Sequence, residues 1–104
     1  MTEFHLAVEM TFVSTPHGAD EQFEQFLDEV LVQLDNIGRK TNLAARLRDR
    51  VADFSASVTA ADFTMAAAAF LMDLRTALHA AGCHTPDWPA FEATEHKVRE
   101  LLDA

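Results

Sequence analysis

The sequence predicts one α+β domain, residues 1–104, in which two helices pack on one face of an antiparallel sheet. Three observations predict it: apolar–polar alternation near the N-terminus, two later segments with helical periodicity, and a glycine after each of these segments. With a strand-like pair between the helices, the order is β-α-β-β-α, and a last strand would complete a split βαβ arrangement. A chain of 104 residues, of which 49% are hydrophobic, suits a single core.

Residues 4–12 alternate apolar and polar side chains, which indicates a strand with one buried face. Residues 20–37 are the first predicted helix, because apolar residues recur at steps of three and four. That stripe consists of Phe23, Phe26, Leu27, Val30, Leu34 and Ile37. Gly38 is placed to end the helix in the left-handed conformation. The adjacent Arg39 and Lys40 suit the negative end of the helix dipole better than an anion site.

Residues 42–47 and 51–60 are predicted to form a β-hairpin with a polar turn between them. A helix over residues 43–54 is the alternative, because Leu43, Leu47, Val51 and Phe54 also follow steps of three and four. We favour the hairpin, since the β-favouring run 54–59 continues it and the sheet topology requires it.

A long alanine-rich helix follows, and Thr59 and Asp62 have the spacing of a capping box at its start. Its predicted buried stripe is Phe63, Ala67, Phe70, Leu71, Leu74, Leu78 and Ala81. Gly82 is placed to end it. Met65 and Met72 fall beside the stripe, where they belong either to a broad buried flank or to an apolar contact patch.

Residues 91–102 fit either a helix or a strand around 91–98, and the topology favours the strand that closes the sheet. The sheet face away from the helices then presents His5, Glu9, Thr11, Arg46, Asp53, Ser55 and Ser57. No aromatic ring is among these side chains, and RNA-binding sheets of this topology stack bases on aromatic rings. The pattern therefore disfavours RNA binding and favours a polar contact surface.

Seventeen acidic residues against eight basic ones give the chain a formal net charge of −9. Such a surface repels nucleic-acid phosphates and acidic membranes, so neither is an expected partner. The acidity indicates solubility in the first place, and otherwise attraction to a basic protein surface. No apolar run in this sequence is long enough to span a membrane. Because its N-terminal residues follow a strand pattern and not a basic-then-apolar one, we do not expect secretion by a signal peptide. The single cysteine fits a reducing cytoplasm.

His79, Cys83 and His84 are the only compact group of metal-ligand residue types, and they are weak candidates for a metal site. Zinc takes three or four ligands in fixed geometry, whereas the helix-ending Gly82 separates His79 from Cys83. The sequence contains no nucleophile elbow, phosphate-binding glycine loop or facing carboxylate pair. We therefore expect no enzymatic activity and no cofactor.

Trp88 stands in a turn between Pro86 and Pro89, and it is the most distinctive residue of the chain. It is expected either to cap the core, because a lone tryptophan usually buries most of its area, or to anchor a partner.

The run 54–60 (FSASVTA), the helix end 77–82 (ALHAAG) and the turn 85–89 (TPDWP) resemble small uncharacterised proteins of actinobacteria and their phages. The resemblance covers the C-terminal half well and the N-terminal half loosely. It implies a ferredoxin-like α+β fold and a cytoplasmic setting. It implies no activity, cofactor or site residue.

These observations lead us to expect a small acidic cytoplasmic module that binds a protein partner or a second copy of itself. The candidate contact residues are Trp88, His5, Glu9, Arg46, Asp53, Ser55 and Ser57. One alternative is a phage-type acidic inhibitor that occupies a basic surface on a host protein, and another is a small-ligand or metal binder.

Overall fold

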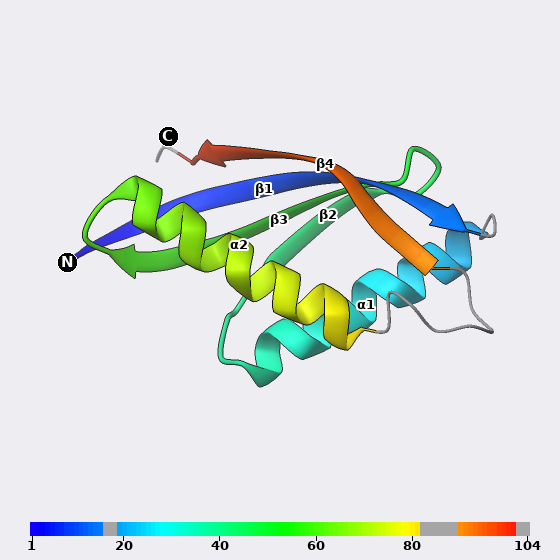
Figure 1. The fold of residues 1–104 in the computed structure, drawn as a ribbon, viewed down its shortest axis with the longest axis horizontal. Helices are drawn as coiled ribbons and strands as arrows, with labels where there is room; N and C mark the ends of the chain where they lie inside the picture. The colour runs from blue at the N-terminus through cyan, green and yellow to red at the C-terminus, as the bar shows by residue number, and fades with distance from the viewer. Residues whose placement is uncertain (16–18, 82–89, 102–104) are drawn as a thin grey trace.

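The computed structural model describes the backbone of residues 1–15, 19–81 and 90–101, and the side chains of residues 1–13, 19–81 and 96–101. The described residues form two helices and four strands, which confirms the α+β class (Figure 1). In chain order these are β1 (Thr2–Thr15), α1 (Asp20–Asn36), β2 (Asn42–Arg46), β3 (Val51–Ala60), α2 (Phe63–Ala80) and β4 (Ala90–Glu100). Neither helix in these ranges is long and apolar enough to cross a membrane.

The four strands make one antiparallel sheet in the order β2-β3-β1-β4. The predicted hairpin is confirmed, because Leu43 pairs with Phe54 and Arg46 pairs with Val51. The helix alternative for residues 43–54 is therefore wrong. The last segment is also a strand, which pairs with β1 along its length except for one irregularity after Thr11.

Both helices pack on the same face of the sheet, and the core lies between the two layers (Figure 1). Even-numbered positions of β1 and β3 point into this core, as the alternation predicts. The buried apolar side chains include Leu6, Val8, Met10, Phe12, Phe54 and Val58 from the sheet, and Phe23, Val30, Leu34, Phe70 and Leu74 from the helices. Phe4, Leu43 and Leu47, also predicted for this face, are partly buried against it.

The end of α1 follows the prediction for Gly38, which adopts the left-handed conformation at φ +80°. Its amide donates to the Asp35 carbonyl at 2.9 Å, and the Arg39 amide donates to the Leu34 carbonyl at 2.9 Å. These two bonds form a Schellman motif that satisfies carbonyls at the helix end. The prediction that Ile37 continues the buried stripe is wrong: Ile37 is 48% exposed, because α1 ends at Asn36 and Ile37 has left the helical conformation.

The start of α2 differs from the predicted capping box. Asp62 is itself the N-cap, and its carboxylate accepts a hydrogen bond from the Met65 amide at 2.8 Å. Thr59 remains inside β3, so it cannot cap the helix. Met65 and Met72 are 54% and 69% exposed, which excludes the buried-flank interpretation. The predicted end at Gly82 lies outside the described residues.

Candidate functional site

The sheet face opposite the helices, here called the open face, is covered by no other described element (Figure 1). It consists of Glu3, His5, Ala7, Glu9 and Thr11 of β1, Val51, Asp53, Ser55, Ser57 and Thr59 of β3, Asn42, Ala44 and Arg46 of β2, and Lys97 and Arg99 of β4. All six candidate contact residues other than Trp88 therefore lie on one surface. Strand register brings them together, since His5 is opposite Ser57 and Glu9 is opposite Asp53.

A two-pronged ion pair crosses the middle of the open face. The Arg99 guanidinium on β4 donates to both carboxylate oxygens of Asp53 on β3, at 2.7 and 3.1 Å. The Asp53 hydrogen bond and charge, with a smaller contribution from Glu9, raise the pKa of Arg99 above its usual value. The pair connects the edge strand β4 to β3 across the central strand β1. It therefore holds one positive and one negative side chain together on the open face.

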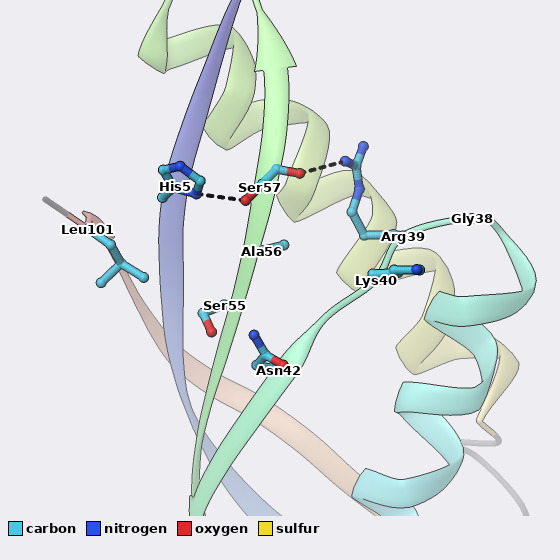
Figure 2. A pocket seen from close by; sticks show the side chains of 9 residues that line it. All are labelled: His5, Gly38, Arg39, Lys40, Asn42, Ser55, Ala56, Ser57 and Leu101. Atoms are coloured by element: carbon cyan, nitrogen blue, oxygen red, sulfur yellow. Dashed lines mark hydrogen bonds between the residues drawn. The ribbon is translucent and has the colours of Figure 1, made fainter. Parts of the chain in front are cut away.

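A pocket of about 520 Å³ lies at one end of the open face (Figure 2). We call it the Ser57 pocket, and it is lined by His5, Gly38, Arg39, Lys40, Asn42, Ser55, Ala56, Ser57 and Leu101. No carboxylate is among these lining residues. Its cationic lining residues are Lys40 and Arg39, of which Arg39 is paired with Asp73, and the rest of the lining is rich in hydrogen-bonding groups.

The Ser57 pocket exists because β2 has five residues whereas β3 has ten. The second half of β3 therefore lacks a neighbouring strand on that side, and the chain between α1 and β2 lies there instead (Figure 2). Arg39 from this segment donates to the Ser57 carbonyl at 3.3 Å and to the Asp73 carboxylate on α2 at 2.8 Å. The expectation that Arg39 serves the α1 dipole is thus wrong, because its guanidinium turns to β3 and α2.

His5 and Ser57 are joined across the open face, with Nδ1 of His5 2.7 Å from the Ser57 hydroxyl. The Glu3 carboxylate lies 3.6 Å from Nε2 of His5, beyond a good hydrogen bond. Ser57 stands on a regular strand, and a nucleophilic serine is usually held on a strained turn with amide donors beside it. The arrangement therefore suits hydrogen bonding to a bound group.

The remaining candidates are not brought into this surface. His79 lies exposed near the end of α2, whereas Cys83, His84 and Trp88 lie outside the described residues. Across residues 1–13, 19–81 and 96–101, no three side chains of His, Cys, Asp or Glu come together as a metal site would require.

The sequence did not lead us to expect Arg39, Lys40 and Asn42 in the lining of a pocket. The available signal was the short spacing between Gly38 and the predicted hairpin, which leaves too few residues for β2 to cover all of β3.

No family model matches this chain, and no curated protein matches it. The resemblance to actinobacterial and phage proteins, with the cytoplasmic setting it implies, stays a prediction.

Proposed function

We propose that this protein is a small interaction module that binds through its open face, and that its partner there is a second copy of itself. The observation that carries the proposal is the placement of both helices on one side of the sheet, which leaves the other side as a broad polar surface. Sheet faces and edges of this kind are common sites of self-association.

The charges of the open face support a second copy as the partner. The face mixes the acidic Glu3, Glu9 and Asp53 with the cations Arg46, Lys97 and Arg99, so a two-fold contact can place opposite charges together. By contrast, α1 carries six acidic residues and no basic one. Two copies that approach through α1 repel each other, whereas two copies that approach through the open face do not.

The acidic surface of α1 favours a second candidate function, an acidic inhibitor that occupies a basic surface on another protein. Its binding would weaken steeply with added salt, because exposed charges more than a Debye length apart are screened. A small-ligand binder is a third candidate, supported by the Ser57 pocket and the hydrogen-bonding groups that line it.

The fold that we infer is ferredoxin-like. Read from its other edge, the sheet order is β4-β1-β3-β2, and the chain order is β-α-β-β-α-β, both of which support this assignment.

Sedimentation equilibrium of a matched pair of variants tests the self-association proposal. Arg46→Glu reverses one exposed charge on the open face, and Arg75→Glu makes the same change on the exposed side of α2. We expect a wild-type dimer that Arg46→Glu weakens about tenfold or more and that Arg75→Glu leaves intact. A monomeric wild type, or equal effects of the two variants, contradicts the proposal.

A further inference from the structure

We propose that the groove between α1 and the outer edge of β2 binds an extended basic segment of another protein, which adds to the sheet as a fifth strand. This inference does not depend on the open face, because the groove lies on the helix side of the sheet. It gives the acidic-inhibitor alternative a defined mode of binding.

The groove has a volume of about 350 Å³ and two kinds of lining. Leu27 of α1, Leu43 and Ala45 of β2, and Leu47 of the following turn form an apolar floor. Glu24 and Asp28 of α1 form an acidic rim, and both are exposed. This combination suits a long side chain with an aliphatic stem and a cationic head, such as arginine or lysine.

The same groove runs along hydrogen-bonding groups that the sheet does not use. The Ser57 carbonyl accepts a hydrogen bond from Arg39, on the side of β3 away from β1. Because backbone groups of a strand alternate in direction, the odd-numbered residues of β3 direct theirs toward β2. Residues 42, 44 and 46 of β2 pair with these positions. The backbone groups of Leu43 and Ala45 consequently point outward at the sheet edge, where an added strand can pair with them.

Leu43 and Ala45 belong both to the groove and to the free edge of β2. The side chains of Leu43 and Ala45 line the groove, while their backbone groups face the free edge. Residues directly opposite each other in a ladder share one face of the sheet. Every second side chain of an added strand therefore enters the groove, which is how strand addition combines backbone affinity with side-chain specificity.

The charge pattern of α1 selects a basic occupant. Asp20, Glu24 and Asp28 follow one another at steps of four, and like charges at this spacing cost a helix about 0.2–0.5 kcal/mol per pair. Arg50 from the β2–β3 turn neutralises Asp20 at 2.7 Å, whereas no basic side chain of the described residues forms an ion pair with Glu24 or Asp28. A cationic side chain in the groove would relieve this repulsion.

The test uses fluorescence anisotropy with a labelled probe peptide that alternates arginine with leucine. Control peptides carry glutamate in place of arginine, N-methyl groups on the arginine amides, or N-methyl groups on the leucine amides. We propose that the peptide pairs antiparallel to β2, so that the arginines opposite Leu43 and Ala45 form the backbone hydrogen bonds. We expect binding of the parent peptide with a Kd below about 100 μM, loss of binding with glutamate or N-methyl-arginine, and retention with N-methyl-leucine. Equal effects of the two N-methylated peptides would overturn strand addition.

Matched protein variants locate the site. The double variant Glu24→Gln and Asp28→Asn should raise Kd about tenfold, whereas Glu21→Gln with Asp35→Asn, an equal charge change on α1 outside the groove, should change Kd less than about twofold. Ala45→Pro removes only an outward amide, a position where edge strands tolerate proline, and should weaken binding about fivefold or more with unchanged circular dichroism.

Three results would overturn the proposal. One is no binding of the parent peptide at about 1 mM, and another is an equal loss of affinity in the groove and control double variants. The third is a dimer of this protein that Ala45→Pro abolishes, because the edge would then serve a second copy. The first two results leave the open face untested, whereas the third would also contradict the open face as the contact between two copies, which Arg46→Glu tests separately.

Discussion

Arg99 of β4 reaches across the central strand to Asp53 of β3 and holds its carboxylate by two hydrogen bonds. Arg99 is paired with Ala7 of β1. Ala7 also points to the open face, and it is nevertheless fully buried. The register places the aliphatic stem of Arg99 where it can cover Ala7, since long charged side chains cover apolar surface while the head stays solvated.

Replacing Arg99 with alanine should lower the free energy of unfolding by about 0.5–1 kcal/mol, because the pair is half exposed and solvent screens it. Urea denaturation measures the change. Arg99→Lys should recover only part of it, since an ammonium group cannot make the two-pronged contact. Arg48→Ala, in the exposed β2–β3 turn, is the control and should be neutral; a loss as large as that of Arg99→Ala would contradict the structural role of the pair.

The Arg39–Asp73 pair is predicted to couple the segment after α1 to α2. Both side chains are partly buried, at 25% and 30% exposure, so their hydrogen bond should contribute about 1 kcal/mol. A double-mutant cycle of Arg39→Ala and Asp73→Ala measures this coupling directly. Additive effects of the two substitutions would show that the contact does not form.

The corrected cap of α2 gives a third prediction. Asp62→Ala should cost about 1 kcal/mol, because the Met65 amide loses its acceptor at the helix start. Thr59→Ala should cost less than about 0.5 kcal/mol, because Thr59 is an exposed strand residue. Thermal unfolding followed by circular dichroism compares the two variants. A larger loss of stability for Thr59→Ala would contradict Asp62 as the N-cap and support the capping box.

The sequence predicted the class, the two-layer packing and the part of the open face that β1, β2 and β3 supply, because periodicity decides which side chains of a strand share a face. Lys97 and Arg99 of β4 were not predicted for this face, since residues 91–102 fitted a helix as well as a strand. Gly38 was also predictable, since its left-handed conformation is a local requirement. The exposure of Ile37, Met65 and Met72 was not predictable. These residues lie at the border of a buried stripe, where a helix that ends one residue earlier or rotates slightly changes a side chain from buried to exposed.

The site was predictable only in part. Ser57 and His5 follow from strand alternation, whereas Arg39 joins them because β2 is shorter than β3 and leaves a space that Arg39 enters. The partner of a long flexible cation depends on the tertiary arrangement of Asp73 and β3, which no local pattern encodes.

Chemical-shift mapping on dilution tests most directly whether the open face is a contact surface. Between about 1 mM and 10 μM, we predict concentration-dependent amide shifts that gather on the open face around Arg46, Asp53 and Ser55, with none at Met72 or Arg75 on the outer side of α2. Shifts confined to α2, or a spectrum that does not change over this range, would contradict the account.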